Sequence, residues 1–144
     1  MFLGEYQHSI DQKGRVILPA KFREELADGM VIAMGLDKCL FVYTPAEWAK
    51  LEDSIREMPL ISNQNARAFT RRLLSGATKG APDKQGRVSL PQNLRDFAGI
   101  SKDVVVIGVG SRAEIWDKEV WAKYSAETES SYSEIAEQLT GLGI

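Results

Sequence analysis

Apolar and polar residues alternate near the start of the chain in a way that is typical of a half-buried strand. The alternation runs over residues 6–10, and a glycine-containing turn is expected at residues 12–14. Residues 15–18 after this turn are expected to form the return strand, with Val16 and Leu18 on one face and Arg15 and Ile17 on the other. The N-terminal region is therefore expected to be a β-hairpin.

The next stretches predict short helices and further strands. Pro19 and Pro91 suit the first turn of a helix. The residues expected to face inward from these two helices are Phe22, Leu26, Leu94 and Ala98. Two strands are expected after each helix, at residues 30–34, 40–43, 103–107 and 113–116.

Three longer stretches predict amphipathic helices. Thr44-Pro45-Ala46-Glu47 has the pattern of a capping box, and it precedes an apolar stripe of Trp48, Leu51, Ile55 and Met58. A second helix after Pro59 has its stripe at Ala66, Phe69 and Leu73. From Asp117 a third helical stretch is expected to bury Trp121, Tyr124, Ile135 and Leu139, with a weak section at residues 127–133.

The chain contains an internal repeat. Residues 11–19, Asp-Gln-Lys-Gly-Arg-Val-Ile-Leu-Pro, recur 72 positions later at 83–91 as Asp-Lys-Gln-Gly-Arg-Val-Ser-Leu-Pro, and Arg23 matches Arg95. After one inserted residue the match continues as far as Trp48-Ala-Lys50 and Trp121-Ala-Lys123. Repeated units of this kind bury their apolar faces against one another. The repeat therefore predicts a pseudo-symmetric pair in a mainly β fold with flanking α-helices (α+β).

The repeat also indicates how the chain is divided. The expected organisation is a first repeat at 5–47, a helical connector at 48–76, a second repeat at 77–120 and a C-terminal helical tail at 121–144. Residues 79–82, Lys-Gly-Ala-Pro, stand where the first repeat has Gln-His-Ser-Ile. The first strand of the second repeat is thus expected to be less regular, and its loop need not contribute equally.

Composition narrows the class of protein. Hydrophobic residues make up 44% and charged residues 26% of the chain, which are ordinary globular values. No apolar run approaches the roughly 20 residues that span a bilayer, and the N-terminus lacks the pattern of a signal peptide. A single cysteine, Cys39, excludes an intramolecular disulfide and a cysteine-cluster metal site. A cytoplasmic protein without membrane contact is expected.

Charge is distributed unevenly along the chain. The net charge of −2 argues against a nucleic-acid partner, because phosphate binding depends on basic side chains. However, residues 113–144 hold seven acidic and two basic residues, a net charge of −5. Residues 1–112, with 16 basic and 13 acidic residues, have a net charge of +3. The chain thus has a mildly basic body and an acidic tail.

Residues for catalysis are few. The chain has one histidine and one cysteine, and it lacks a metal-ligand cluster, a phosphate-binding glycine loop and a Gly-x-Ser-x-Gly motif. His8 lies on the apolar face of a strand and Cys39 near a hairpin turn, so both are interpreted as structural. No enzyme activity, cofactor, metal or small-molecule substrate is predicted.

The repeated Asp-x-x-x-Arg loops are the candidate functional feature. Asp11 and Arg15, or Asp83 and Arg87, could simply form an ion pair across a turn, a contact worth about 0–1 kcal/mol when exposed. The functional interpretation rests on the arginine fork, which can bind phosphate or guanine edges through two donors. The aspartates would then orient each loop, together with the glycines at its turn, Gly14 and Gly86.

Two basic clusters have open interpretations. Lys13, next to the first arginine, is either part of a solvated charged face or a DNA contact. The arginines at 67, 71 and 72 could cap helices, pair with the acidic residues at 47–57, or contact phosphate, and a structural or interface role is favoured.

The motifs resemble those of a known family. The residues that carry the resemblance are Met1–His8, the two Asp-x-x-x-Arg loops, Phe22-Arg23, Ala66–Phe69 and Ser75–Thr78. They are similar to the MraZ family of bacterial regulators, within the AbrB-like (SpoVT-AbrB) superfamily. The likeness covers nearly the whole chain.

This resemblance implies a duplicated AbrB-like swapped-hairpin β-barrel, in which the two repeats of one chain take the parts of two subunits. It implies a ring-like homo-oligomer that binds double-stranded DNA at short G-rich direct repeats. These repeats precede the division and cell-wall gene cluster that begins with the regulator's own gene, and binding usually represses it. It also implies association with the nucleoid. The family motif falls on Asp11, Arg15, Asp83 and Arg87.

A ring would offset the acidic net charge, since several weak loop contacts then act together on repeated sites. The alternative is an antitoxin-like or scaffold module whose acidic C-terminus binds a protein partner. Against it, the second repeat occupies the place where a toxin-binding tail would begin.

Overall fold

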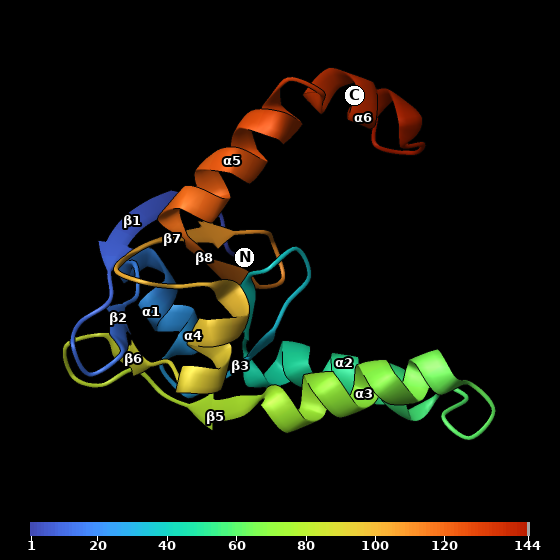
Figure 1. Ribbon diagram of the computed structural model, residues 1–144, viewed down its shortest axis with the longest axis horizontal. Helices are drawn as coiled ribbons and strands as arrows, with labels where there is room; N and C mark the ends of the chain where they lie inside the picture. Colours follow the sequence, from blue (N-terminus) through green and yellow to red (C-terminus); the bar gives the residue numbers. More distant parts are fainter. Residues whose placement is uncertain (144) are drawn as a thin grey trace.

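The computed structural model describes residues 1–143 as an α+β fold (Figure 1). The first repeat forms β1 (Glu5–Ser9), β2 (Arg15–Ile17), α1 (Ala20–Leu26), β3 (Met30–Met34) and β4 (Leu40–Tyr43). The second forms β5 (Thr78–Gly80), β6 (Arg87–Ser89), α4 (Gln92–Ala98), β7 (Asp103–Gly108) and β8 (Ala113–Asp117). The remaining helices are α2 (Pro45–Arg56), α3 (Gln64–Gly76), α5 (Lys118–Glu129) and α6 (Tyr132–Gln138).

The two repeats exchange their first strands. In the six-stranded antiparallel sheet, of order β1-β7-β8-β4-β3-β5, β1 pairs with β7 of the second repeat and β5 pairs with β3 of the first. The second strands, β2 and β6, pair with each other in a separate ribbon. Across residues 1–143 the strand pairing forms this row and this ribbon and does not close into one circuit. The predicted α+β fold of two repeats forming one pseudo-symmetric unit is confirmed.

One apolar core serves both repeats. The inward residues predicted for the two short helices, Phe22, Leu26, Leu94 and Ala98, are all buried in it. Val16 and Val88 face each other at the centre of the ribbon and belong to the same core. Because this core draws on both repeats, each repeat buries apolar side chains against the other.

The predicted helices begin where expected, but the two prolines lie one position earlier than predicted, at the N-caps. Thr44 Oγ1 accepts a hydrogen bond from the Glu47 backbone N–H at 3.2 Å, as the capping box predicts. By contrast, Pro19 and Pro91 lie just before their helices rather than inside the first turn, since their ψ angles of 138° and 153° are extended. Proline still suits this position, because its fixed φ leads the chain into the helix.

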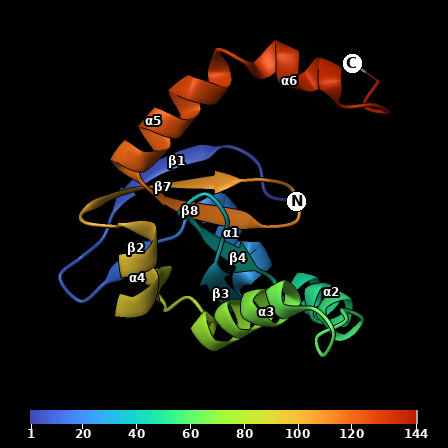
Figure 2. The same ribbon diagram turned by 45° about the vertical axis from the view of Figure 1, so that its right-hand side comes forward.

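Helices α2 and α3 lie side by side as an arm on one side of the body (Figures 1 and 2). Trp48, Ile55 and Leu73 form a second buried cluster beneath this arm. Phe69, a member of the predicted apolar stripe, is 45% exposed and is not part of this cluster. Phe69 instead lines a groove whose walls come from α3, α4 and the loop after β3.

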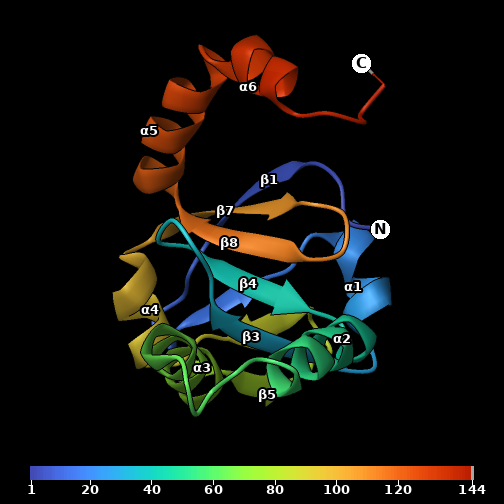
Figure 3. The same cartoon turned by 90° about the vertical axis from the view of Figure 1, so that its right-hand side faces the viewer.

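The C-terminal tail leaves the body after a short contact. Trp121 and Tyr124 pack against Trp116 with ring centroids 5.2 and 4.9 Å apart, so their predicted contact with the core is partly confirmed. The prediction that Ile135 and Leu139 are buried is wrong, since they are 44% and 56% exposed. The chain bends between α5 and α6, inside the section predicted to be weak, and α6 then projects away from the sheet (Figure 3).

Candidate nucleic-acid interface

The first Asp-x-x-x-Arg loop is a tight hairpin loop. The Gly14 N–H donates to the Asp11 carbonyl at 3.0 Å, and the Asp11 N–H donates to the Arg15 carbonyl at 2.9 Å. Gly14 has a φ of +78°, in the left-handed region that completes a loop of this length. The predicted turn glycine is therefore needed for its backbone conformation.

The Asp11 carboxylate organises this loop. Its Oδ1 accepts from the backbone N–H groups of Lys13 and Arg15, both at 2.9 Å. Its Oδ2 accepts from Arg15 Nε at 2.7 Å. Only Nε of the guanidinium is engaged in this pair, so the donors on the two terminal nitrogens of Arg15 are not used by Asp11.

The second loop repeats this geometry closely. Asp83 Oδ1 accepts from the N–H groups of Gln85 and Arg87 at 2.9 and 2.8 Å, and Oδ2 accepts from Arg87 Nε at 2.8 Å. Gly86 has the same φ of +78°. Both predicted pairs are thus formed as ion pairs, and the same contact fixes the direction of each arginine.

These contacts also keep the aspartates ionised. The hydrogen bond from the Arg15 backbone N–H is the largest influence on the pKa of Asp11, and with the Arg15 side chain it lowers that pKa below its usual 3.8. The Arg87 backbone N–H has the same leading effect on the pKa of Asp83. Each loop therefore carries a complete Asp–Arg ion pair at neutral pH.

The β2–β6 ribbon brings the two arginines together. Arg15 lies opposite Ser89 and Ile17 lies opposite Arg87. Since alternate strand residues share a face, all four side chains lie on one face of the ribbon. Arg15 and Arg87 are diagonal neighbours across the two strands, a relation in which the Cα atoms lie about 7–8 Å apart. Ile17 is 40% exposed between them. Figure 1 shows both loops at the same end of the molecule, away from the α2–α3 arm.

Each loop is also held by the other repeat. The Leu18 N–H donates to the Gly86 carbonyl at 2.9 Å, and the Leu90 N–H donates to the Gly14 carbonyl at 2.8 Å. These reciprocal bonds tie each loop glycine to the strand end of the opposite repeat, so the spacing between the loops is fixed by the backbone.

Two further arginines, Arg23 and Arg95, support the loops. They occupy matching positions in the two repeats, but no contact with the loops was predicted for them. Arg23 and Arg95 donate through Nε to the Leu18 and Leu90 carbonyls, each at 2.9 Å. A β-carbon placed on Gly86 would lie 2.3 Å from Arg23 Nε, and one on Gly14 would lie 3.0 Å from Arg95 Cζ. Each loop glycine is thus covered by an arginine of the other repeat. The sign of this supporting role in the sequence was that Arg23 and Arg95 occupy matching positions in the two repeats.

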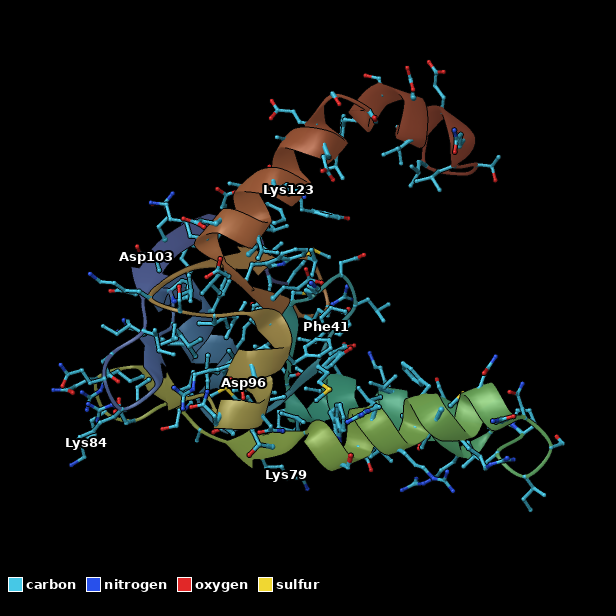
Figure 4. The ribbon with its side chains drawn as sticks, in the orientation of Figure 1. Phe41, Lys79, Lys84, Asp96, Asp103 and Lys123 are labelled. Carbon is cyan, nitrogen blue, oxygen red and sulfur yellow. The ribbon has the colours of Figure 1, made fainter. Side chains whose placement is uncertain are left out.

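The lysines occupy different positions in the two loops. Lys13 is the third residue of the first loop and is exposed, whereas the second loop has Gln85 there and Lys84 one position earlier. Figure 4 shows Lys84 projecting from the outer end of its loop. The candidate interface is therefore basic at both tips but not symmetric in detail.

Cys39 and His8, the two residues interpreted as structural, do not lie on the outer face of the β2–β6 ribbon. Cys39 is buried and donates from Sγ to the Leu36 carbonyl at 2.9 Å, and burial raises its pKa to about 12. His8 faces inward, and its Nε2 is buried with no hydrogen-bond partner in residues 1–143. Burial, followed by the charge of Arg23, lowers the pKa of His8 below its usual 6.5.

The described residues lack both a metal-binding cluster and a helix able to span a membrane. They hold no group of three or more histidine, cysteine, aspartate or glutamate side chains placed to bind a metal ion. None of their helices combines the length and apolar character needed to cross a bilayer.

Comparison with known proteins identifies the family to which this chain belongs. A family model described as "MraZ protein, putative antitoxin-like" matches the chain twice, over residues 1–72 and 73–142. The chain belongs to the MraZ family. Each of the two MraZ matches contains one of the arginine loops, Asp11–Arg15 in the first and Asp83–Arg87 in the second.

Named relatives agree with this MraZ membership. The chain is 54% identical to the "Transcriptional regulator MraZ" of Natranaerobius thermophilus and of a Thermoanaerobacter species, over 144 residues and the full length of each protein. It is 50% identical to the protein of the same name from Desulforamulus reducens over 142 residues, 99% of each chain. The resemblance predicted from the motifs is confirmed.

Proposed function

We propose that this protein is a transcriptional regulator that binds double-stranded DNA through the outer face of the β2–β6 ribbon and its two loops. The observation that carries the proposal is the pair of ordered arginines, Arg15 and Arg87, which share one face of the ribbon with their terminal nitrogens free of the aspartates. The names of the relatives support a regulator of transcription.

The chemistry of the loops suits guanine and phosphate. A guanidinium held at Nε can donate from its terminal nitrogens to N7 and O6 of guanine or to a phosphate. Asp11 and Asp83 set the direction of each arginine before DNA arrives, which reduces the side-chain entropy lost on binding. Arg15 is the leading contact in this proposal, Arg87 assists, and Lys13 contacts phosphate.

The finer proposal concerns the target and the assembly. Short G-rich direct repeats upstream of the protein's own gene would each take one arginine loop, and binding would repress the gene cluster that follows. With a net charge of −2, one chain has little general attraction for DNA. A ring-like homo-oligomer would present several loops at once, so that weak contacts add. Such a protein would be found with the nucleoid in the cytoplasm.

The test compares two arginine substitutions on the protein's own upstream DNA. Arg15→Ala removes a loop contact, whereas Arg56→Ala removes the same charge from α2, where Arg56 pairs with Asp53 at 3.2 Å. We expect Arg15→Ala to lose about 1–3 kcal/mol of binding free energy, roughly ten- to hundredfold in affinity, and to bind with a smaller salt slope. The Arg56 variant should bind like the wild type.

Mobility shift at several salt concentrations measures both quantities, and circular dichroism and sedimentation check folding and assembly. Unchanged affinity and salt slope in a folded, assembled Arg15→Ala protein would exclude the ribbon face as the DNA site.

A further inference from the structure

The α5–α6 tail carries an exposed row of apolar side chains. Tyr132, Ile135, Leu139 and Leu142 are 69%, 44%, 56% and 54% exposed. Tyr132 and Ile135 lie one turn apart on α6, and Leu139 and Leu142 follow in the segment after the helix ends at Gln138. They line an open groove of about 600 Å³ along the tail. An apolar row of this kind on a projecting tail indicates a protein-binding surface.

The same tail is acidic without internal compensation. After Lys123, residues 124–143 hold four glutamates, at 127, 129, 134 and 137, and no lysine or arginine. No ion pair within residues 1–143 involves any of these glutamates. A matching surface should therefore combine apolar side chains with positive charge.

Helix α3 on the arm carries the complementary charge. It holds Arg67, Arg71 and Arg72 and no acidic residue. Arg67 donates to the Leu60 and Ile61 carbonyls at 3.0 and 2.7 Å, so it closes the turn between the arm helices. Arg71 and Arg72 form no ion pair within residues 1–143, so the possible pairing with the acids at 47–57 is not observed.

An apolar groove lies next to these arginines. It has a volume of about 600 Å³, and its walls include Leu36, Phe69, Arg72 and Phe97. Leu36 is 62% exposed, Phe69 45% and Phe97 36%. Large apolar side chains at this exposure match the tail in apolar character. Arg72 in the wall and Arg71 beside it on α3 outnumber the single acid of the wall, Asp96, so the charge is also complementary.

The rim of this groove is held in a costly backbone conformation. Asp37 and Lys38, which follow Leu36, both have a φ of 61°. A non-glycine residue adopts this left-handed region only at a cost in free energy, and such strain collects at functional positions. The Gly35 N–H donates to the Cys39 carbonyl at 2.8 Å and closes this turn, which keeps Leu36 at the edge of the groove.

We propose that the α5–α6 tail of one copy docks into the α3 groove of a second copy. A contact between residues 124–143 of two copies is disfavoured, because it would bring together eight glutamates with no basic residue between them. The tail and the arm project from different sides of the body (Figures 1 and 3). Each docking therefore leaves one tail and one groove free, so the contact continues from copy to copy until a ring closes.

This interface deepens the proposed function, since it would hold the arginine loops of successive copies at a fixed spacing. The full-length chain provides the test through two variants at exposed positions. The tail variant carries Ile135→Asp and Leu139→Asp, and the groove variant carries Phe69→Asp and Arg72→Glu. Ile61→Asp is the matched control, because Ile61 is 95% exposed and lines neither groove.

Sedimentation velocity of each protein, alone and mixed, measures the outcome. We expect the wild type and the Ile61 control to form the same large species, and the tail and groove variants to be monomers. A mixture of the two variants should form a one-to-one dimer and nothing larger, because one intact tail then meets one intact groove. A chain with Glu134→Arg, Glu137→Arg, Arg71→Glu and Arg72→Glu should regain assembly that each pair alone removes.

Wild-type assembly of either variant would overturn the interface. So would a groove variant that still dimerises, which indicates tail–tail contact, or a monomeric wild type whose tail binds a different protein. DNA binding is scored separately on a single-site fragment. If the assembly pattern holds while no protein binds the fragment, the DNA-binding proposal fails and the interface remains.

Discussion

The two arginine loops share one geometry but differ in the residues placed upon it. The Arg–Asp distances are 2.7 Å in the first loop and 2.8 Å in the second, and both loop glycines have a φ of +78°. Their basic residues differ, with Lys13 third in the first loop and Lys84 second in the other. The loop backbone is thus constant, while the charge around it varies.

The strands leading into the loops differ more. β1 has five residues and the isolated Ile10–Val16 bridge after it, whereas β5 has three residues and is followed by Pro82, which lacks an N–H. The predicted irregularity of the second repeat is confirmed. The second loop has the same shape without these contacts, so a long first strand is not needed to form it.

The largest expected effect separates the two arginines. Arg15→Ala and Arg87→Ala should each weaken DNA binding about tenfold to hundredfold, with the larger loss for Arg15, and the double variant should lose more than about a hundredfold. Fluorescence anisotropy on operator DNA measures the three affinities. Arg15→Lys is the control for charge, since lysine lacks the fork. A loss for Arg87→Ala equal to that for Arg15→Ala would remove the distinction between the loops.

The next effect concerns stability and distinguishes the loop glycines. Alanine at Gly14 or Gly86 should cost about 1–2 kcal/mol because of the positive φ. The loss should be larger at Gly86, since the new β-carbon would displace Arg23 from its bond to the Leu18 carbonyl. Urea unfolding measures both. Gly80→Ala, with no atom within 4 Å of its new β-carbon, should change stability little. A Gly14 variant less stable than the Gly86 variant would contradict this account.

A smaller effect tests the loop lysines. Lys13→Gln makes the third position of the first loop like that of the second, and Gln85→Lys makes the reverse change. We expect the first substitution to weaken DNA binding less than about tenfold and to reduce the salt slope by about one, and the second to raise it by a similar amount. Affinity measured against salt concentration gives both slopes. Identical slopes in all three proteins would show that neither position contacts phosphate.

The smallest effect is a pH dependence confined to the first repeat, because the second repeat has Gly80 at the position that matches His8. The pKa of His8 is lowered below its usual 6.5, so protonation favours the unfolded chain. Its contribution to stability should be complete above pH 6.5 and decline as the pH falls below that value. Thermal unfolding of wild type and His8→Gln from pH 5 to 8 isolates it. A stability advantage of the wild type over His8→Gln that grows as the pH falls would have the wrong sign.

Local features of this fold could be predicted from the sequence because their hydrogen bonds lie within a few residues. The Thr44 cap bonds three residues ahead, and the Asp11 carboxylate bonds two and four residues ahead. The repeat added an internal check, since the same spacing occurs around Asp83. The assignment of Arg15, Arg87 and Lys13 to DNA, and the division into domains, stay predictions.

Features that depend on distant partners could not be predicted in this way. Periodicity indicates which residues form β1, but not that its partner is β7 rather than a strand of its own repeat. It likewise places Phe69 and Leu139 on apolar helix faces without showing what covers those faces. Arg23 was visible as a repeated residue, but its position against Gly86 depends on the exchange of strands.

The exchange of strands also sets the order of events during synthesis. β1 contains Glu5, whose partner in the sheet is Ile107, so the first strand made must wait for about one hundred further residues. At about 5–20 residues per second, this delay is about 5–20 s. During that time the edge of β1 has no partner, and a second nascent chain on the same messenger could offer its own β7. The spacing of ribosomes thus bears on whether this fold closes within one chain or between two.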